Sequence, residues 1–380
     1  MGSAAPYTRR AGPALLLAIV ALGCSVALTR CAILRPGETF LAQKTPSVGT
    51  LDRSGGPLLR VLVFGDFGFS GRQQTAVARA MVEEHRARGF DFALMLGDNL
   101  YPCGPDLDLP GARDCAFNAD GNTVDPDYRP PVDPQFRELF HGPLAELKLP
   151  SGEPLPVHAA LGNHDVGYSG TCMVWGKLPI RDVRAKACLE VAHREPGWSM
   201  PARHFVVDTP GARFIVFDSN ALATDGYAFS FEAELAFVKE AIAGCGERRC
   251  FLAAHHMPVT AGTHRPQTLT EGYMKRVRQL EEAGRIDGWL AGHDHDLQHS
   301  LTAKGYDVFV SGSSAKERVE QFGPKPAPGA RLHFGTTAWG FAVLEVFPAG
   351  WSMRFLDEQR TPLYCCEANG QSPCAPVACP

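Results

Sequence analysis

The sequence has no excess of positive charge, which separates it from proteins that bind nucleic acid through a basic surface. It contains 37 lysine and arginine residues against 41 aspartate and glutamate residues, for a net charge of −4. No run of like charges suggests an arm that binds a polyanion. We therefore expect no nucleic acid among the partners, and the chemistry must lie in local clusters of side chains.

Several catalytic signatures are also absent. The sequence has no Gly-x-Ser-x-Gly elbow that would expose a nucleophilic serine. The glycine-containing stretch 310–314 lacks the lysine of a phosphate-binding loop. There is no internal repeat and no second hydrophobic core, so one folded domain is expected in this chain of 380 residues.

The longest apolar run near the N-terminus is too short for a membrane span. Arg9 and Arg10 precede the uncharged run 14–28, whereas a spanning helix needs roughly 20 residues. A positive start and a short apolar stretch are typical of an export signal. Residues 21–24 resemble a lipoprotein cleavage box, which leaves three forms open: an anchor lipidated at Cys24, an uncleaved N-terminal anchor that attaches the chain to a membrane, or a cleaved soluble protein. In each form the protein is extracytoplasmic, whether cell-surface, periplasmic or secreted.

The cysteines agree with an oxidising compartment. Besides Cys24 and Cys31 the chain has ten cysteines, an even number, arranged as local pairs and a C-terminal group of four. Proximity in the sequence favours three disulfide bonds: Cys103–Cys115, Cys172–Cys188 and Cys245–Cys250. A zinc site made from the C-terminal cysteines is the alternative, although no histidine or paired Cys-x-x-Cys spacing supports it.

Composition divides the chain into four segments. We expect an export signal or anchor at 1–30 and a linker rich in proline, glycine and serine at 31–58. The folded domain would extend over 59–358, and a cysteine-rich tail over 359–380.

Within the folded domain, apolar strand-like runs alternate with helical patterns. The strands are expected at 60–64, 90–96, 157–161, 204–208, 213–218, 250–254 and 286–290. The helices are expected at about 73–88, 134–147, 231–243 and 269–283. The closing third, with runs at 306–310, 340–347 and 351–356, alternates like antiparallel strands. This order indicates an α/β sandwich with its site at the carboxyl ends of strands.

Five of the strands are followed directly by aspartate, asparagine, tyrosine or histidine. One such residue alone is more often a helix cap or a hydrogen-bonded structural residue. Five in the same position are hard to explain as caps, and oxygen donors together with imidazoles suit first-row metals. Two metals need about seven protein ligands, which this set supplies. The stretches are Asp66-Phe67-Gly68, Gly97-Asp98-Asn99-Leu100-Tyr101, Gly162-Asn163-His164-Asp165, Ala253-Ala254-His255-His256 and Gly292-His293-Asp294-His295.

These stretches resemble the five metal motifs of purple acid phosphatases, which belong to the calcineurin-like metallophosphoesterases. The likeness extends over about 60–356 and is nearest to the small, mammalian-type tartrate-resistant form. It implies an α/β sandwich of two mixed β-sheets flanked by helices. Most members of the wider superfamily carry a histidine where Gly68 stands here. Tyr101, three residues after Asp98, instead marks the purple acid phosphatases, whose tyrosinate binds ferric iron.

The resemblance implies a mixed-metal centre. Fe(III) would be bound by Asp66, Tyr101 and His295, with Asp98 as the bridging ligand. The second metal, which would be Fe(II), Zn(II) or Mn(II), would be bound by Asn163, His256 and His293. Position before Met257-Pro258-Val259 favours His256 over its neighbour His255, which would pack or orient.

Two further histidines are expected on the substrate side. His164 would contact the phosphate or protonate the leaving group. His264 lies about where the mammalian-type subgroup carries a second such histidine, although its spacing from His256 is one residue short. The alternative for His264 is a surface loop residue.

The resemblance implies hydrolysis of phosphate monoesters, of acid phosphatase type, by a metal-bound hydroxide, with a small phosphorylated substrate. We expect the protein to be a monomer. A phosphodiesterase or nucleotide pyrophosphatase on the same metal site is the near alternative. The segments expected to line the pocket, 102–132 and 166–200, do not indicate which ester is the substrate. Two more distant hypotheses are a surface protein that binds metal or phosphate without turnover, and redox chemistry at an iron pair.

Overall fold

The computed structural model describes residues 32–33, 39–41, 51–169, 172–173, 179–316, 321–322 and 326–379. The expected export signal, including Cys24, lies outside the described residues. Within the described ranges, no helix has both the length and the apolar character that crossing a membrane requires.

One eight-stranded mixed sheet is built around four parallel strands, each of which leads into a loop. The parallel strands are β3 (Leu59–Phe64), β4 (Phe92–Met95), β5 (Val157–Ala159) and β6 (Trp198–Ser199). Beyond β3, antiparallel pairing adds β15 (Gly340–Val346), β16 (Gly350–Asp357), β17 (Pro362–Asn369) and β18 (Ala375–Val377). All four residues of β4 and all seven of β15 are buried, as expected for strands covered on both faces.

The second eight-stranded sheet has the order β2-β14-β11-β12-β10-β9-β8-β7. Its strands are β2 (Thr39–Leu41), β7 (Phe205–Asp208), β8 (Ala212–Val216), β9 (Arg249–Ala253), β10 (Gly288–Ala291), β11 (Leu297–Leu301), β12 (Asp307–Ser311) and β14 (Arg331–Thr336). The central strands β8, β9, β10 and β12 are parallel to one another. A separate pair joins β1 (Ala32–Ile33) to β13 (Gln321–Phe322).

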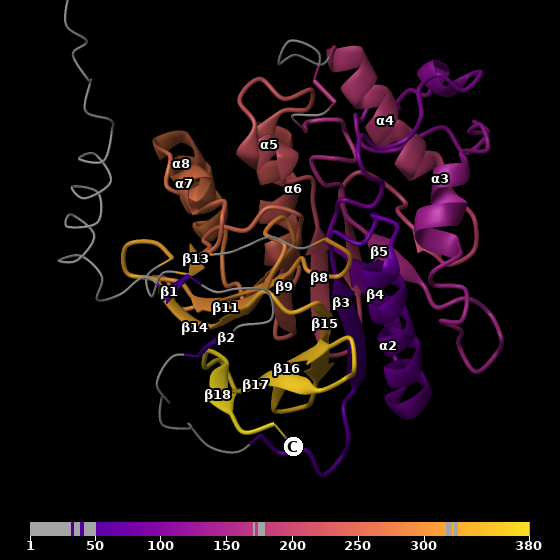
Figure 1. The fold of residues 1–380 in the computed structure, drawn as a ribbon. Coiled ribbons are helices and arrows are strands. Elements are labelled where there is room, and N and C mark those ends of the chain that lie inside the picture. Colours follow the sequence, from indigo (N-terminus) through magenta and orange to yellow (C-terminus); the bar gives the residue numbers. More distant parts are fainter. Residues whose placement is uncertain are drawn as a thin grey trace, which may run out of the picture.

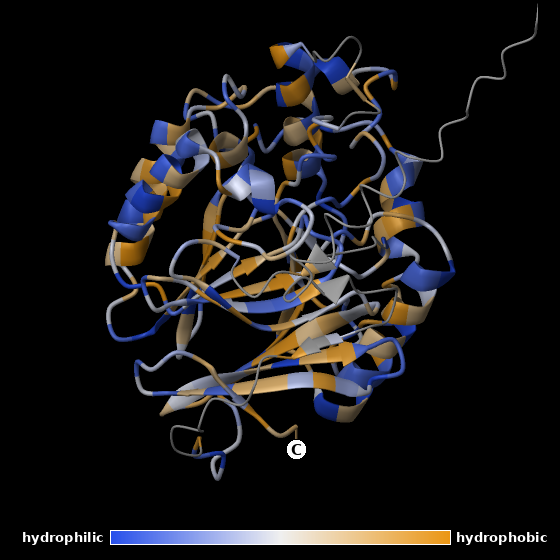
Figure 2. Ribbon diagram, turned by 60° about the vertical axis from the view of Figure 1, so that its left-hand side comes forward, coloured by the Kyte–Doolittle hydropathy of each residue, from blue (hydrophilic) through white to orange (hydrophobic). Residues whose placement is uncertain are grey.

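Aromatic side chains join the inner faces of the two sheets. Phe251 of the second sheet lies edge-on to Trp351 of the first, with ring centroids 5.3 Å apart, and Phe214 meets Phe92 at 5.5 Å. Figure 2 shows the apolar colour concentrated in the strands between the helical layers. The expected α/β sandwich of two mixed sheets flanked by helices is therefore confirmed (Figure 1).

Helices cover the outer sides of both sheets (Figure 1). On the side of the first sheet lie α2 (Arg72–Arg88), α3 (Pro134–Phe136), the π-helix η2 (Arg137–His141) and α4 (Ile180–Ala192), with the short η1 (Ala112–Asp114). On the other side lie α5 (Asn220–Ala223), α6 (Phe231–Ala243), α7 (Arg265–Thr268) and α8 (Glu271–Glu281). In α8 the buried residues Tyr273, Val277 and Leu280 recur at helical spacing and therefore share one face, as expected for the helix that the sequence predicts.

The helix predicted at 134–147 is wrong beyond its first turns. The chain forms α3, then one π-helical turn in which Gly142 N–H donates to the carbonyl of Arg137, and then turns. Pro143 follows directly and has no N–H with which to continue the helix. The helix α4 was not predicted, because it lies in a stretch interpreted only as a pocket wall.

Two expectations for the C-terminal third need correction. The run at 306–310 forms β12, which pairs antiparallel with β11 but parallel with β10. Residues 359–380, expected as a separate tail, contribute β17 and β18 to the first sheet.

Among the described residues there are five disulfide bonds, and only one of the three predicted pairings is confirmed. Cys245–Cys250 is correct, whereas Cys103 pairs with Cys172 and Cys115 with Cys188. These two bonds connect the loop after β4 to the region of α4 across about 70 residues of chain, which sequence proximity cannot anticipate. The tail cysteines form Cys365–Cys379 and Cys366–Cys374, so the zinc alternative for them is wrong. Five disulfides fit an extracytoplasmic protein.

A mostly buried histidine on β5 predicts a loss of stability in acid. His158 packs against Phe92, and its Nδ1 is buried with no hydrogen-bond partner among the described residues. Burial lowers the pKa of His158 to about 4. Since the histidine of the unfolded chain has a pKa of about 6.5, the unfolded state binds more protons between these values. This residue should therefore cost about 3 kcal/mol of stability as the pH falls from about 6.5 to about 4.

Replacement His158→Leu should remove that contribution and flatten the acid side of the stability profile. Denaturant unfolding of the wild type and the variant at pH 7 and pH 4.5 measures the difference. An unchanged pH dependence in the variant would show that His158 is not a neutral buried group.

Candidate metal centre

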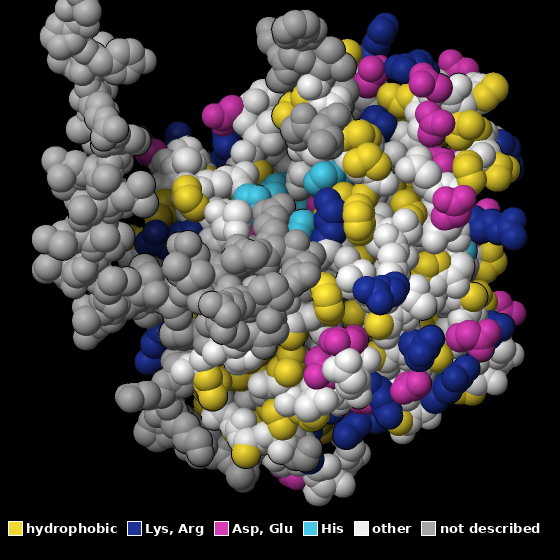
Figure 3. Space-filling model, viewed as in Figure 1, with side chains coloured by type: hydrophobic (Ala, Val, Ile, Leu, Met, Phe, Trp, Pro, Cys, Tyr) yellow, Lys and Arg dark blue, Asp and Glu magenta, His cyan; other side chains and the backbone are white. Residues whose placement is uncertain are grey.

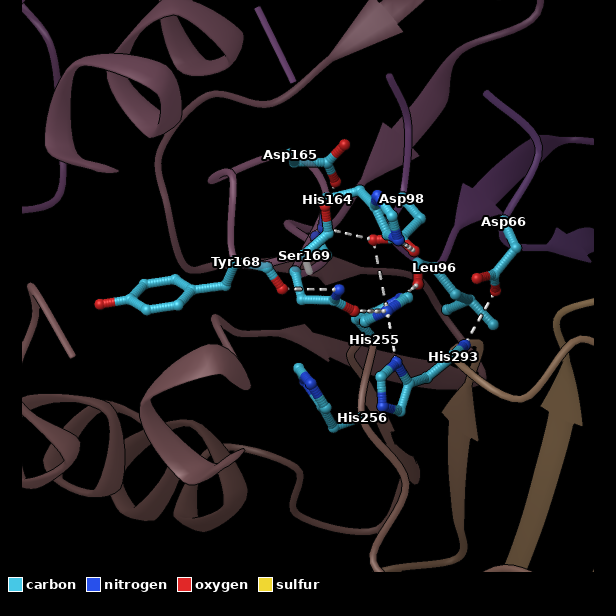
Figure 4. Close-up of polar contacts among 12 residues, drawn as sticks. Asp66, Leu96, Asp98, His164, Asp165, Tyr168, Ser169, His255, His256 and His293 are labelled. Carbon is cyan, nitrogen blue, oxygen red and sulfur yellow. Dashed lines mark hydrogen bonds and ion pairs between the residues drawn. The ribbon is translucent and has the colours of Figure 1, made fainter. Parts of the chain in front are cut away.

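The loops that follow β3, β4, β5, β9 and β10 converge at one edge of the two sheets (Figure 4). Three of their residues have left-handed backbone conformations that are uncommon for side chains with a Cβ: Asp66 (φ 54°), Asp98 (φ 54°) and His293 (φ 73°). Such backbone strain persists where the surrounding structure enforces it and is concentrated at functional sites. The five polar stretches therefore meet in one place, as the sequence predicts.

Gly68 has a steric explanation. A Cβ at this position would lie 1.9 Å from the carbonyl oxygen of Asn99. The loops after β3 and β4 approach too closely for any side chain here, so the histidine of the wider superfamily could not be accommodated. Tyr101 can therefore serve as the metal ligand in place of that histidine.

The first group of donors contains Asp66, Asp98, Tyr101 and His295, all buried. The hydroxyl of Tyr101 lies 2.9 Å from Asp66 Oδ1, 2.7 Å from Asp98 Oδ2 and 3.3 Å from His295 Nε2. His295 Nε2 is 3.4 Å from Asp66 Oδ1. Three oxygen donors and one imidazole nitrogen thus point at a common centre.

The protonation equilibria of this group show why it suits a cation. Burial, together with the charge of Asp98, raises the pKa of Asp66 to about 7. Burial opposes ionisation of Asp98 too, but His255, His164 and the Tyr101 hydroxyl outweigh it and lower the pKa of Asp98 to about 2. Burial and the two carboxylates raise the pKa of Tyr101 well above its usual value. A multivalent cation among these atoms would offset the repulsion and favour all three anionic forms.

The second group contains His255, His256 and His293, all buried. His255 Nε2 lies 3.0 Å from Asn163 Oδ1, 3.1 Å from His293 Nδ1 and 3.4 Å from Asp98 Oδ1. Its Nδ1 lies 2.9 Å from the carbonyl oxygen of Leu96, to which it donates in the tautomer with Nε2 unprotonated. A backbone acceptor on one ring nitrogen commonly fixes a metal-binding histidine, because it leaves the other nitrogen for the metal.

His256, which its position before Met257 favoured as a ligand, belongs to the same group. Its Nδ1 is 3.0 Å from Ser219 Oγ, and its ring centroid is 4.4 Å from that of His293. In Figure 4, dashed lines join His255 to Asp98 and to His293, whereas none joins His256 to the residues drawn. The contacts of the Asn163, His293 and Asp98 side chains thus converge on His255.

The two expected substrate-side histidines flank the centre. His164 Nδ1 is 2.5 Å from the carbonyl oxygen of Pro102, and its Nε2 is 3.9 Å from Asp98 Oδ2. Burial is the main reason that the pKa of His164 is lowered. His264 Nδ1 is 2.7 Å from Asp294 Oδ1, and its ring stacks on His293 with centroids 3.8 Å apart. In Figure 3 histidine side chains reach the surface as a small group beside a basic side chain.

Residues outside the predicted set hold the loops together. Asp165 Oδ1 accepts hydrogen bonds from the backbone N–H groups of Asn99 (2.7 Å) and Leu100 (3.0 Å), and its Oδ2 accepts from Gly162 N–H (2.7 Å). The side-chain amide of Asn99 also donates to Glu190 of α4 at 2.8 Å. Asp165 could have been found from its place in the Asn163-His164-Asp165 stretch, whereas nothing local in the sequence distinguishes Glu190.

Lys316 is a further residue of the site that was not predicted. Its Nζ lies 3.9 Å from the centroid of the Tyr101 ring and 5.0 Å from that of Phe69. It therefore adds a positive charge beside the first group of donors. No motif carries it, and it comes near Tyr101 only through the path of the chain after β12.

Comparisons with known proteins agree with this geometry. The family model described as calcineurin-like phosphoesterase matches residues 59–297. Tartrate-resistant acid phosphatase type 5 of Sus scrofa is 24% identical over 324 residues, which cover 81% of this chain and 86% of that protein. Purple acid phosphatase 7 of Arabidopsis thaliana is 24% identical over 291 residues, which cover 70% and 74%.

Among solved structures, GAP50, the anchor in the inner membrane complex of Plasmodium, shares the fold with a TM-score of 0.60 at 15% identity, covering 82% of this chain and 88% of that chain. The family match extends over more than half of the 380 residues and includes all five polar loops. This chain therefore belongs to the calcineurin-like phosphoesterases and is a metal-dependent phosphoester hydrolase.

Proposed function

We propose that this protein is an acid phosphatase that hydrolyses small phosphate monoesters at a binuclear centre of Fe(III) and a divalent metal. The observation that carries the proposal is the position of the Tyr101 hydroxyl, within hydrogen-bond distance of both Asp66 and Asp98. A phenolate is a strong hard donor, and hard donors favour ferric iron over softer divalent ions.

The proposed ferric ligands are Asp66, Tyr101 and His295. The proposed ligands of the divalent metal, which would be Fe(II), Zn(II) or Mn(II), are Asn163, His293 and His255, the last in place of the His256 that spacing favoured. Asp98 is suited to bridge, because its Oδ2 faces the tyrosine at 2.7 Å and its Oδ1 faces His255 Nε2 at 3.4 Å.

When bound, the two cations supply an acidified water as nucleophile and neutralise charge on the phosphoryl group. Residues of the chain orient and protonate the substrate. His164 is held through Nδ1 by the Pro102 carbonyl, so that Nε2 lies on the side of Asp98 and can contact the phosphate or protonate the leaving oxygen. His264, stacked on His293 and fixed by Asp294, is proposed as the second substrate-side histidine.

The choice of monoesters rests on charge. A phosphate monoester carries up to two negative charges, whereas a diester carries one. Lys316, beside Tyr101, adds a positive charge to that of the two proposed metal ions, which favours the more highly charged substrate. The walls near this position are fixed by the Cys103–Cys172 bond, since Cys103 follows Pro102 directly.

The visible spectrum of the full-length protein, measured together with its metal content, tests the proposal. We expect iron, a broad visible absorption band, and faster cleavage of p-nitrophenyl phosphate than of its bis-ester at acid pH. Tyr101→Phe should lose the band. The matched control Tyr128→Phe removes a hydroxyl that donates to the Gly111 carbonyl, and it should keep the band.

Each contrary result rejects a definite part of the proposal. Colourless protein with two zinc or manganese ions and esterase activity would reject the ferric–tyrosinate site but keep the hydrolase. Faster cleavage of the bis-ester would favour a phosphodiesterase. Protein with neither metal nor esterase activity after reconstitution would favour a surface protein without turnover.

A further inference from the structure

A second set of metal-type side chains lies outside the five loops. His141 is the last residue of η2, His193 directly follows the last residue of α4, and Glu195 is two residues further on. They belong to the helical layer on the side of the first sheet (Figure 1). The ligand atoms of all three lie within 4.8 Å of one another.

The geometry is close to that of a three-residue zinc site. His141 Nε2 is 2.8 Å from His193 Nε2 and 3.5 Å from Glu195 Oε2. With zinc–ligand bonds of about 2.0–2.2 Å and tetrahedral angles, donor atoms lie roughly 3.3–3.5 Å apart. The carboxylate already has this spacing, and the two imidazole nitrogens need to separate by only about 0.5 Å to reach it.

The two imidazole rings are held in place by aromatic neighbours. The His193 ring stacks on Phe136 at 3.8 Å and meets the edge of Trp198 at 5.8 Å. His141 lies edge-on to Phe140 at 4.9 Å. Burial also lowers the pKa of His141 and, together with His141, lowers the pKa of His193 to about 3. Both rings are therefore neutral near pH 7, which is the form that binds a metal.

The surroundings favour a cation with access from solvent. The carboxylate of Glu195 carries a negative charge, and the C-terminus of the 13-residue helix α4 contributes partial negative charge. The guanidinium of Arg194 is turned onto the backbone carbonyls of Pro126 (2.7 Å) and Asp125 (3.2 Å). A cavity of about 400 Å³, lined in part by His193 and Glu195, leaves room for a water as the remaining ligand.

We propose that His141, His193 and Glu195 bind one divalent cation of the zinc class, separate from the catalytic centre. Two imidazoles and one carboxylate suit zinc, for which such a donor set is common. The cation would join η2 to the end of α4. Because Glu190 of α4 accepts a hydrogen bond from Asn99, beside Asp98, this cation would stabilise the helix that supports the catalytic loops.

Zinc stoichiometry and thermal unfolding of the full-length protein test this site. We compare wild type, His141→Gln, Glu195→Gln and the control Glu146→Gln. The control fits because the side chains of Glu146 and Glu195 are similarly exposed, at 64% and 61%.

Wild type and control should bind one zinc equivalent more than His141→Gln, and zinc should raise their Tm. Glu195→Gln should bind this equivalent at least about tenfold more weakly. Equal stoichiometry and an equal zinc-dependent Tm in wild type and His141→Gln would overturn the proposal. If His141→Gln does not fold, the Glu195→Gln variant, at an exposed side chain, tests the proposal by itself. An unchanged zinc affinity in Glu195→Gln would then overturn the proposal. The readout is a difference between variants and does not use esterase activity, so it is independent of the proposed function.

Discussion

Asp98→Asn should lower the turnover of a phosphate monoester by on the order of 10³-fold. The amide of asparagine has one oxygen and no charge, so it cannot bridge the two proposed metal ions as the carboxylate can. It should nevertheless fold, because asparagine tolerates the left-handed backbone of this position (φ 54°), and its oxygen can still accept the hydrogen bond from His164 N–H. The measurements are kcat with p-nitrophenyl phosphate and the metal content of the purified variant.

The control for this variant is Asp114→Asn, at an exposed carboxylate in η1. The control should keep wild-type turnover and metal content. If Asp98→Asn also kept two metals and most of its turnover, Asp98 would not be the bridging ligand.

The fold could be predicted from the sequence where the signals are local. Helix α6 has the predicted bounds, since Ser230 caps it by accepting the N–H of Ala233, and its buried side recurs at helical spacing. Features that depend on contacts distant in the sequence were missed. The pairing of Cys115 with Cys188 requires α4 to lie against the loop after β4, and β17 joins the first sheet only because β16 offers it an edge.

The same distinction applies to the site. The five loops were predictable because each donor follows a buried strand, and parallel strands end at a common edge. Lys316 and Glu190 were not, since each reaches the centre from an element with no signature of its own. His264 arrives beside His293 despite its short spacing because Asp294 Oδ1 accepts from its backbone N–H (3.0 Å) and lies 2.7 Å from its ring.

His255→Gln should lose the divalent metal and lower the turnover by about 10³-fold. His256→Gln should keep both metals and lower the turnover only about tenfold. Spacing before Met257-Pro258 favoured His256, because a sequence pattern gives the position of a residue but not the direction of its side chain. In the structure, His255 Nε2 lies among Asn163 Oδ1, His293 Nδ1 and Asp98 Oδ1.

The two variants are matched, since they make the same substitution at adjacent buried residues. Metal content by elemental analysis separates loss of a ligand from loss of a neighbour, which turnover alone cannot do. Loss of the divalent metal in His256→Gln, with both metals kept in His255→Gln, would restore the assignment that spacing favours. That result would need only a small shift of the His256 ring, because one of its nitrogens already lies within 4.8 Å of ligand atoms of His255 and His293.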